Sequence, residues 1–383
     1  MSIRKSQTVG VLGAGQLGRM LALAGYPLGI HFSFLDPSGG APAAELAPVM
    51  HAPYDDEEAL VRLASSVDVV TYEIEALPLK AVESLAQSVP VCPATSALAV
   101  AQDRLEEKRL CERLDIPVVP WHPVASPEEA AEALTNLPGP LLLKRRRGGY
   151  DGRGQSLFDD TVSVEDAWRA LGNEPMIVES VVDFQRELSL IAVRGFDGVR
   201  ATYPLVENHH RDGILRLSLA PAPRVTDGVQ RTAEIYADRL LQHLDYVGVL
   251  TIEFFEVAGE LMLNEMAPRV HNSGHWTIEG AETSQFENHL RAILQLPLGS
   301  TDARCPCAMV NLVGDIPLLA PVLHVQGASV HLYGKESRPA RKLGHVTVRG
   351  RNWEQVWDRL QKTGLAIQPD ELRACEAVGV EWP

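Results

Sequence analysis

LLLKRRRGGYDGRGQSLF, residues 141–158, joins two apolar strands through a loop that contains four glycines. Glycine backbones fold closely enough for several amides to surround an anion. Lys144 at the end of the first strand and Arg153 in the loop add positive charge. A Walker A or Rossmann loop would open a helix instead of a second strand. The stretch therefore predicts a glycine-rich lid over a polyphosphate, with a mobile basic hairpin as the alternative.

A second hairpin is predicted in LTIEFFEVAGELMLNEM, residues 250–266. A three-residue turn at 258–260, with glycine in the left-handed conformation, is a favoured connection and would set Glu253 opposite Glu265. Two carboxylates on one apolar face repel each other unless a cation compensates them. Mg²⁺ takes one or two carboxylates together with substrate phosphates. The hairpin thus predicts a magnesium–nucleotide site, with a solvated sheet edge as the alternative.

The motif GAGQLG, residues 13–18, follows an apolar strand, opens a helix and precedes Asp36 at the end of the next strand. This is the spacing of a dinucleotide-binding fingerprint, which on its own favours an NAD-dependent oxidoreductase. The physical content of the motif is broader, because amides at a helix N-terminus favour any anion. Such a turn also serves helix–strand packing. The motif alone leaves the ligand open.

The composition is that of a soluble globular chain of 383 residues, with 45% hydrophobic and 22% charged residues. A net charge of −15 argues against binding to nucleic acid or to an anionic membrane surface. The five cysteines lack zinc-ligand and redox spacing, which predicts reduced thiols in the cytoplasm. No signal-like segment or apolar run of about 18 residues is present, so no membrane insertion is expected.

Apolar runs and helical patterns alternate through the first hundred or so residues, as in a parallel sheet flanked by helices. We expect strands at 8–13, 31–36, 68–73 and 89–93, and helices at 17–26, 56–65 and 78–87. After a helix at 102–114, strands pair through glycine-containing turns between helices, which indicates an α+β region. A tail from about 320 is expected to add a few strands and a helix at 352–363. The predicted fold class is α/β followed by α+β.

Several motifs together resemble those of one enzyme family. They are GAGQLGRM, TYEIE, GYDGRGQ, NEMAPRVHNSGHWT and KESRPARKLGH, and they follow in this order along nearly the whole chain. The set resembles the 5-(carboxyamino)imidazole ribonucleotide synthetase family of the ATP-grasp superfamily. The resemblance implies a Rossmann-like N-terminal domain at 1–100, a central ATP-grasp domain at 101–300 with a lid at 115–180, and a small β-rich C-terminal domain at 301–383.

The resemblance also implies a carbon–nitrogen ligase that uses ATP and Mg²⁺, with Mn²⁺ as a substitute. Its substrates would be 5-aminoimidazole ribonucleotide and bicarbonate, joined through carboxyphosphate in purine biosynthesis. A closing lid suits this intermediate, because carboxyphosphate hydrolyses readily when water enters. A cytoplasmic homodimer that binds neither nucleic acid nor membrane is expected.

The resemblance assigns residues to four roles. ATP would contact Arg104, Lys144, Gly149, Tyr150, Asp151, Gly152, Arg153, Gly154, Gln155, Glu179, Ser180, Val181, Val182, Glu187, His210, Asn264 and Glu265. The ribonucleotide would contact Gln16, Leu17, Glu73, Tyr150, Asp151, Arg153, Ser273, His275, Lys335 and Arg341. The catalytic groups would be Arg153, His275 and Arg269, the last holding bicarbonate or carboxyphosphate, while Glu253 and Glu265 would bind the metal ion.

The tail motif KESRPARK, residues 335–342, gathers four cations in a chain of net charge −15. Arginine binds phosphate through parallel hydrogen bonds and lysine through its point charge. This predicts a site for the ribonucleotide 5′-phosphate, with a solvated basic loop as the alternative. Three other functions stay open: a formate-dependent ligase for glycinamide ribonucleotide, a Rossmann-type NAD-dependent oxidoreductase, and a non-catalytic nucleotide-binding protein.

Overall fold

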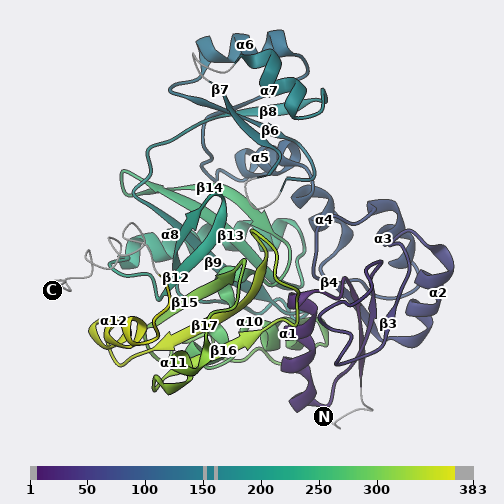
Figure 1. The fold of residues 1–383 in the computed structure, drawn as a ribbon. Coiled ribbons are helices and arrows are strands. Elements are labelled where there is room, and N and C mark those ends of the chain that lie inside the picture. Colours follow the sequence, from purple (N-terminus) through teal and green to yellow (C-terminus); the bar gives the residue numbers. More distant parts are fainter. Residues whose placement is uncertain (1–6, 150–152, 159–162, 367–383) are drawn as a thin grey trace.

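The structure, a computed structural model, describes residues 7–149, 153–158 and 163–366. Its strands form three sheets (Figure 1). The N-terminal residues make a parallel sheet with the order β3 (Val49–Met50), β2 (His31–Leu35), β1 (Thr8–Leu12) and β4 (Val69–Tyr72). The predicted alternation of strands and helices is confirmed here. The strand expected at 89–93 is wrong, because this segment makes only an isolated bridge between Val70 and Val91.

A nine-stranded antiparallel sheet forms the centre of the molecule. Its order is β14 (Glu260–Ala267), β13 (Gly248–Val257), β9 (Arg186–Arg194), β11 (Val206–Arg211), β12 (Ile214–Ala220), β15 (Cys307–Val313), β17 (Lys342–Arg349) and β16 (Ala328–Leu332), with β10 (Arg200–Thr202) beside β9. The C-terminal strands therefore extend the sheet that holds the acidic hairpin. The basic tail, residues 335–342, connects β16 to β17 of this same sheet.

A third, antiparallel sheet forms a separate lobe at the top of Figure 1. Its order is β5 (Trp121–Val124), β8 (Met176–Ser180), β6 (Leu141–Arg145) and β7 (Gln155–Phe158), and the helices of this lobe are α6 (Pro127–Asn136) and α7 (Val164–Ala170). The glycine-rich loop joins β6 to β7, which confirms the predicted strand–loop–strand arrangement. Helix α5 (Arg104–Arg113) lies between this lobe and β14.

The remaining helices pack around the sheets. They are α1 (Gln16–Gly25), η1 (Tyr26–Leu28), α2 (Glu57–Ser66), α3 (Leu79–Leu85), α4 (Thr95–Ala101), α8 (Asp227–His243), η2 (Asn272–Gly274), α9 (Thr277–Gly280), α10 (Gln285–Ile293), α11 (Leu319–His324) and α12 (Trp353–Lys362). Within the described ranges, none of the helices is both long enough and apolar enough to cross a bilayer.

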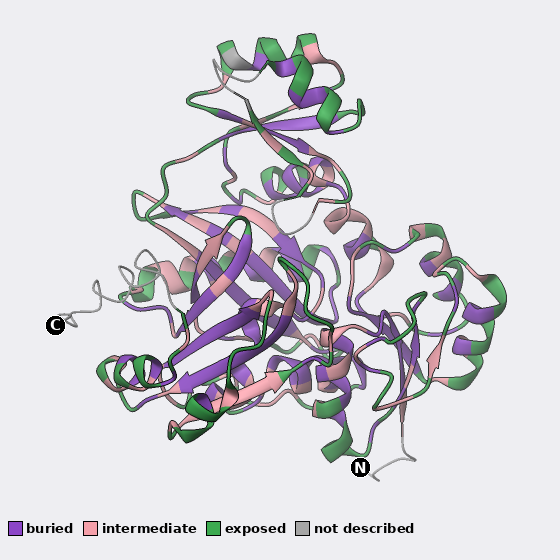
Figure 2. Ribbon diagram, in the orientation of Figure 1, coloured by how far each residue is buried: buried purple, intermediate pink, exposed green. Residues whose placement is uncertain are grey.

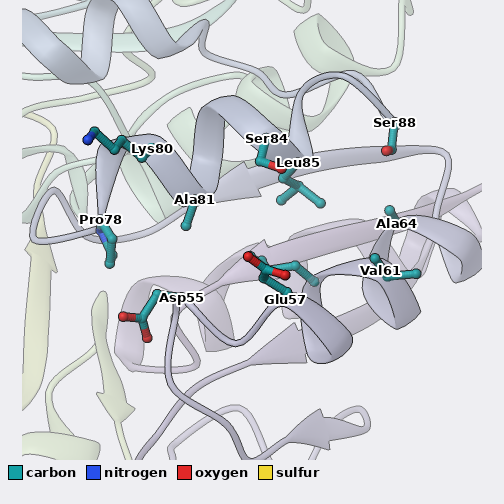
Figure 3. Close-up of a pocket in the computed structure, with 11 residues that line it drawn as sticks. Asp55, Glu57, Val61, Ala64, Pro78, Lys80, Ala81, Ser84, Leu85 and Ser88 are labelled. Carbon is teal, nitrogen blue, oxygen red and sulfur yellow. The ribbon is translucent and has the colours of Figure 1, made fainter.

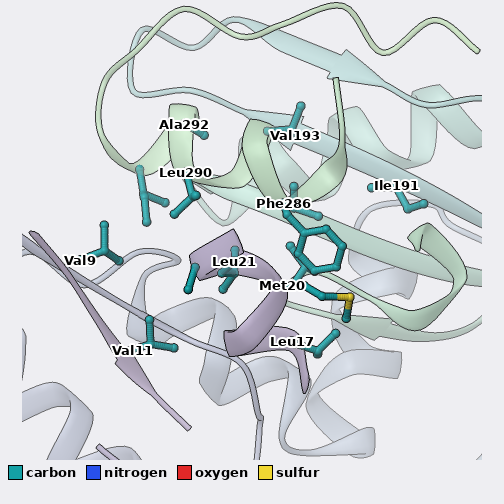
Figure 4. Packing of buried hydrophobic residues seen from close by; sticks show 14 of the residues in the cluster. Val9, Val11, Leu17, Met20, Leu21, Ile191, Val193, Phe286, Leu290 and Ala292 are labelled. Atoms are coloured by element: carbon teal, nitrogen blue, oxygen red, sulfur yellow. The ribbon is translucent and has the colours of Figure 1, made fainter. Parts of the chain in front are cut away.

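The largest apolar cluster joins the N-terminal sheet to the central sheet. Met20 and Leu21 of α1 pack in it with Phe286 and Leu290 of α10 (Figure 4). Burying each such side chain is worth roughly 1.5–3 kcal/mol. Most residues of β9, β12, β15 and β17 in the central sheet are buried, while the outer helix faces are exposed (Figure 2). This packing holds the GAGQLG loop, which opens α1, against the central sheet.

The turn of the acidic hairpin differs from the prediction. Val257 lies opposite Glu260, so Ala258 and Gly259 alone connect β13 to β14. Both residues have positive φ, 52° and 85°, as a two-residue type I′ turn requires. The expected three-residue turn is therefore wrong.

Candidate active site

The acidic pair forms despite the shorter turn. Glu253 lies opposite Glu265, whereas the next residue, Phe254, lies opposite Leu263. Asn264 is the extra residue of a β-bulge, which restores the register that the shorter turn removes. Glu253 is 14% exposed and Glu265 43% exposed. The hairpin thus presents two carboxylates on one face, one of them largely buried.

The two carboxylates have different proton affinities. Burial, together with the charge of Glu265, raises the pKa of Glu253 to about 7. Burial would also raise the pKa of Glu265, but Arg104 and Lys144 outweigh it and lower that pKa. The guanidinium of Arg104 lies 3.1 Å from Glu265. The raised pKa of Glu253 marks a site that lacks one positive charge, which a divalent cation would supply.

Protein side chains alone do not complete a metal shell here. Among the described residues, no group of three or more His, Cys, Asp or Glu side chains is arranged to hold a metal ion. A pair of carboxylates fits Mg²⁺, which usually keeps its other positions for water and substrate phosphates. The donor set therefore suits a metal ion that arrives with a nucleotide.

A buried charge cluster lies at the base of the lobe. Lys144 on β6 and Lys108 on α5 both pair with Glu179 on β8, and the Lys108 Nζ–Glu179 Oε1 distance is 3.0 Å. Burial opposes ionisation of Glu179, but the two lysines lower its pKa to about 2. The cluster is held by three elements at once. It places Lys144 and Glu179, both predicted nucleotide contacts, side by side.

The stem of the glycine-rich loop is anchored to the start of α5. Asp103 accepts hydrogen bonds from Arg146 Nη2 at 2.6 Å and from Arg147 Nε at 3.2 Å. The backbone N–H of Arg104 also donates to the carbonyl of Arg146 at 2.9 Å. The residues that precede the glycines are therefore fixed to the helix that carries Arg104.

The predicted loop residues lie around this stem. Gln155 pairs with Lys144 where β7 begins. A Cβ atom on Gly149 would lie 3.0 Å from the backbone carbonyl oxygen of Arg153 and 3.2 Å from the Arg104 guanidinium, so the loop backbone approaches both closely. Arg153 is exposed, and Gly154 is half-buried beside it. Three predicted contacts lie outside the described residues: Tyr150, Asp151 and Gly152.

The predicted adenine contacts follow the end of β8. The backbone N–H of Ser180 donates to the carbonyl of Pro120 at 2.9 Å, and that of Val181 donates to the carbonyl of Pro140 at 2.8 Å. These amides are engaged within the protein. The side chain of Val181 is exposed and that of Val182 half-buried, so an apolar surface borders the lobe at this point.

Two further predicted nucleotide residues pair across neighbouring strands. His210 Nδ1 on β11 lies 2.6 Å from Glu187 Oε2 on β9. Burial disfavours the charged imidazole, but Glu187 and then Glu253 outweigh it and raise the pKa of His210. A protonated His210 next to the acidic pair would add positive charge beside a bound polyphosphate.

The first glycine loop is filled by a side chain of the protein itself. Glu73 accepts hydrogen bonds from the amides of Gly15 and Gly18, the latter at 2.7 Å. A Cβ atom on Gly15 would lie 2.5 Å from Glu73, and one on Gly13 2.6 Å from it. The glycines of the fingerprint therefore make room for an internal carboxylate. This arrangement disfavours a dinucleotide pyrophosphate at this helix N-terminus.

The basic tail reaches this same loop. Lys335 Nζ donates a hydrogen bond to Gln16 Oε1, next to Glu73. Arg341 donates to the backbone carbonyl of Glu336 at 3.3 Å on the surface of the tail. Leu17 is buried in the core cluster under the loop, so its side chain packs in the interior. The structure thus brings Gln16, Glu73 and Lys335 together from opposite ends of the chain.

The segment after Glu265 divides into an open part and a buried part. Arg269 Nη2 lies 2.7 Å from Glu75 Oε1. Ser273 is fully buried and shares a hydrogen bond of 2.8 Å with Ser189. His275 is 1% exposed and packs on His345, with ring centroids 4.8 Å apart. The side chains of Ser273 and His275 therefore lie in the interior beneath the site.

Sequence reasoning missed several side chains of the site. His271 Nε2 lies 3.6 Å from Glu253, and its Nδ1 is 2.9 Å from Ser273 Oγ. The position of His271, two residues after Arg269 in an extended segment, is the signal that could have placed it on the same side. Lys108 and Glu75 were also missed. They lie one helical turn after Arg104 and two residues after Glu73, respectively.

A surface pocket between α2 and α3 lies apart from these residues (Figure 3). Its lining includes Asp55, Glu57, Val61, Lys80 and Leu85. None of the predicted site residues contributes to it, so it plays no part in the site.

Three family models match the chain. They are the ribonucleotide synthetase preATP-grasp domain at residues 6–102, the ATP-grasp domain at 109–286, and the phosphoribosylaminoimidazole carboxylase C-terminal domain at 307–359. The first match covers the N-terminal parallel sheet, the second covers the lobe and the strands up to β14, and the third covers β15, β16 and β17.

Relatives cover almost the full length. The N5-carboxyaminoimidazole ribonucleotide synthase of Pseudomonas aeruginosa is 50% identical over 89% of this chain and 94% of its own. The crystal structure of the synthetase from Thermus thermophilus has a TM-score of 0.90 and 52% identity, over 94% of this chain and 99% of that chain. A synthase from Aspergillus clavatus in complex with ADP and 5-aminoimidazole ribonucleotide has a TM-score of 0.86 and 32% identity, over 97% and 99%. By sequence and by structure, this chain belongs to the N5-carboxyaminoimidazole ribonucleotide synthase family of ATP-grasp enzymes.

Proposed function

We propose that this protein joins 5-aminoimidazole ribonucleotide to bicarbonate at the expense of ATP, giving 5-(carboxyamino)imidazole ribonucleotide, ADP and phosphate in purine biosynthesis. The observation that carries the proposal is the convergence on α5 of the glycine-rich loop stem, the Lys144–Glu179 cluster and the acidic pair. The relative from Aspergillus clavatus, crystallised with ADP and 5-aminoimidazole ribonucleotide, supports both ligands.

The reaction has two steps. A bicarbonate oxygen attacks the γ-phosphorus of ATP, the bond to the bridging oxygen breaks, and ADP leaves carboxyphosphate behind. The exocyclic amine of the ribonucleotide then attacks the carbonyl carbon of carboxyphosphate, inorganic phosphate leaves, and the amine loses a proton. Lys144 and Arg104 would oppose the charge of the phosphates, and Arg269 would hold the bicarbonate.

Glu253 and Glu265 would hold Mg²⁺, or Mn²⁺ in its place. When bound, the ion would neutralise charge on the transferred phosphoryl group. Arg104, which is 3.1 Å from Glu265, would keep that carboxylate oriented. The charge of His210 lowers the pKa of Glu253 and would limit the negative charge of the pair, while His271 Nε2 lies 3.6 Å from Glu253.

The ribonucleotide would bind where the basic tail meets the GAGQLG loop. Glu73 and Gln16 are acceptors on one side, and Lys335 and Arg341 are cations on the other. A phosphate distant from the reacting amine mainly positions the substrate. The tail would therefore act on ribonucleotide binding more than on phosphoryl transfer.

A cytoplasmic homodimer completes the proposal. The exposed leucines Leu318 and Leu323, at and within α11, support a contact with a second copy. The four described cysteines are free thiols, which suits a reducing compartment. Sedimentation equilibrium would test the oligomeric state.

The decisive experiment measures ADP release with single components omitted. Turnover should require both 5-aminoimidazole ribonucleotide and bicarbonate, and the product should carry label from ¹⁴C-bicarbonate in an acid-labile form. Formate with glycinamide ribonucleotide should give no turnover. Rapid ADP release with formate and glycinamide ribonucleotide, and none with 5-aminoimidazole ribonucleotide and bicarbonate, would show that the protein is the formate-dependent ligase instead.

A further inference from the structure

The strand that carries Glu265 stands at the edge of the central sheet, where helix α5 and the segment at Pro117 and Val118 both contact it. The backbone N–H of Leu263 donates to the carbonyl of Pro117 at 2.7 Å, and Val118 forms a β-bridge with Leu263. β14 stands at the end of the nine-stranded sheet and pairs only with β13 within it. Helix α5 lies along its open side (Figure 1). Because backbone groups at a sheet edge need partners, the contacts that α5 makes there fix the local path of the strand.

Two adjacent side chains of α5 hold the peptide groups on either side of Glu265. Glu107 Oε1 accepts a hydrogen bond from the backbone N–H of Met266 at 2.6 Å. Lys108 Nζ donates to the backbone carbonyl of Asn264 at 3.3 Å. These two groups belong to the peptide bonds that flank the Cα atom of Glu265. The residue is therefore fixed through its backbone as well as through its side chain.

The same place holds the β-bulge. Asn264 is the bulged residue, and without it Glu265 would not lie opposite Glu253. A one-residue shift in a strand turns every following side chain to the other face. Lys108 contacts the bulged residue, and Glu107 contacts Met266, the second residue after it. The position of Glu265 therefore depends on α5.

We propose that Glu107 is a positioning residue that fixes the backbone directly after the bulge, at Met266, so that Glu265 faces Glu253. The inference rests on the proposed metal role of this pair and deepens it. Glu107 is 3% exposed and sits with Arg104 and Lys108 on one helix face, at the spacing i, i+3 and i+4. Arg104 holds the side chain of Glu265, and Glu107 holds the backbone that carries it.

Glu107 is the better residue to test than Lys108, because Lys108 also pairs with Glu179 in the buried charge cluster at the base of the lobe. Burial raises the pKa of Glu107 to about 8, although Lys108 counteracts the shift. The hydrogen bond from the Met266 N–H needs only an acceptor oxygen at this place. Glutamine, which keeps an acceptor oxygen at the same place, should therefore substitute for it.

The experiment compares Glu107→Ala and Glu107→Gln with Glu106→Ala as the matched control. Glu106 is on the same helix but is half-buried, with 44% of its side chain exposed, and pairs with Arg109. Hydrogen–deuterium exchange of residues 261–267 reports the strand, and Mn²⁺ binding to the enzyme with ADP, followed by electron paramagnetic resonance, reports the metal site. Thermal unfolding verifies that each variant is folded.

In Glu107→Ala, exchange across 261–267 should accelerate and Mn²⁺ should bind about tenfold or more weakly, the usual cost of losing a partner behind a metal ligand. Glu107→Gln and Glu106→Ala should stay close to the wild type in both measurements. Unchanged exchange and Mn²⁺ binding in folded Glu107→Ala would overturn the inference. So would a Glu107→Gln variant as impaired as Glu107→Ala, since the charge and not the acceptor would then matter.

Glu265→Gln separates this inference from the proposed function. If Glu265→Gln binds Mn²⁺ like the wild type, the metal role of the pair is wrong, whatever Glu107 does to the strand. If Glu265→Gln loses Mn²⁺ but Glu107→Ala does not, the positioning role alone is wrong.

Discussion

Lys144 and Arg145 are neighbours on β6 with opposite surroundings. Lys144 pairs with Glu179 in the buried charge cluster at the base of the lobe. Arg145 Nε instead donates a hydrogen bond to the backbone carbonyl of Leu171. We expect Lys144→Ala to lower kcat/KM for ATP by about tenfold or more, because a charge-assisted bond contributes roughly 1.5–3 kcal/mol. Steady-state ADP release would measure it. Arg145→Ala is the control and should leave ATP kinetics unchanged; the reverse pattern would remove Lys144 from the nucleotide site.

If Glu253 holds the metal ion as proposed, we expect metal binding to depend on pH. Its raised pKa, about 7, means that the proton must leave before a divalent cation can bind. Below that value the apparent Mn²⁺ affinity should fall with decreasing pH, approaching about tenfold per unit. In Glu253→Gln the affinity should be low at every pH and the slope should disappear. Titration from about pH 5.5 to about pH 8 with ADP present would measure both.

The matched control for Glu253 is Glu260→Gln, on the same hairpin but exposed at the turn. It should retain the wild-type pH profile. A wild-type profile in Glu253→Gln would show that this carboxylate does not hold the metal ion.

At the scale of elements, α5 lies between the lobe and β14, and its N-cap residue Asp103 joins it to the lobe. Asp103 caps the helix by accepting from the N–H of Leu105 at 3.1 Å, and it also binds Arg146 and Arg147. Asp103→Ala should destabilise the protein by roughly 0.5–2 kcal/mol for the lost cap. It should also raise the KM for ATP, because the loop stem loses its anchor. Thermal unfolding and ADP-release kinetics would measure the two effects.

Asp56 offers the control for this prediction. It caps α2, accepting from the N–H of Ala59 at 2.8 Å, and contacts no predicted site residue among those described. Asp56→Ala should lower the unfolding temperature with unchanged ATP kinetics. Should both variants lose stability and keep a normal KM for ATP, the stem anchor would have no part in nucleotide binding.

At the scale of the whole molecule, the proposed ribonucleotide site would be formed by segments that are far apart in the sequence. Lys335 and Gln16 are 319 residues apart and are hydrogen-bonded. Arg341 lies in the same tail, so Arg341→Ala should raise the KM for 5-aminoimidazole ribonucleotide far more than that for ATP. Initial-rate kinetics with each substrate varied would measure this.

Arg338 provides the comparison within the tail, since its side chain is 66% exposed and pairs only with Glu336 among the ion pairs described. Arg338→Ala should change neither KM. Equal increases of both KM values in Arg341→Ala would indicate a general defect. No increase in either KM would indicate that the tail is a solvated loop that does not bind the substrate.

Patterns local in the sequence were sufficient for much of the fold. Helices such as α8 and α12 follow from apolar spacing, and the strand–loop–strand lid follows from four glycines between apolar runs. The opposition of Glu253 and Glu265 was also predicted, although by a wrong turn. The two-residue turn is one residue shorter than the predicted turn and would shift the pairing by one residue. The extra residue Asn264 in the bulge compensates for this shift, so Glu265 still lies opposite Glu253.

Only the tertiary structure decided which groups meet across long separations. Glu73 fills the glycine loop from 58 residues away, and Glu107 reaches Met266 across 159 residues. It also decided that Ser273 and His275 lie in the interior, although their segment reads as uniformly polar. Periodicity and turn chemistry constrain a residue relative to its neighbours in the chain. Tertiary packing decides which carboxylate accepts from the amides of the glycine loop and which helix contacts an edge strand. Both depend on how distant elements satisfy each other's buried polar groups, and no pattern between neighbouring residues reveals this.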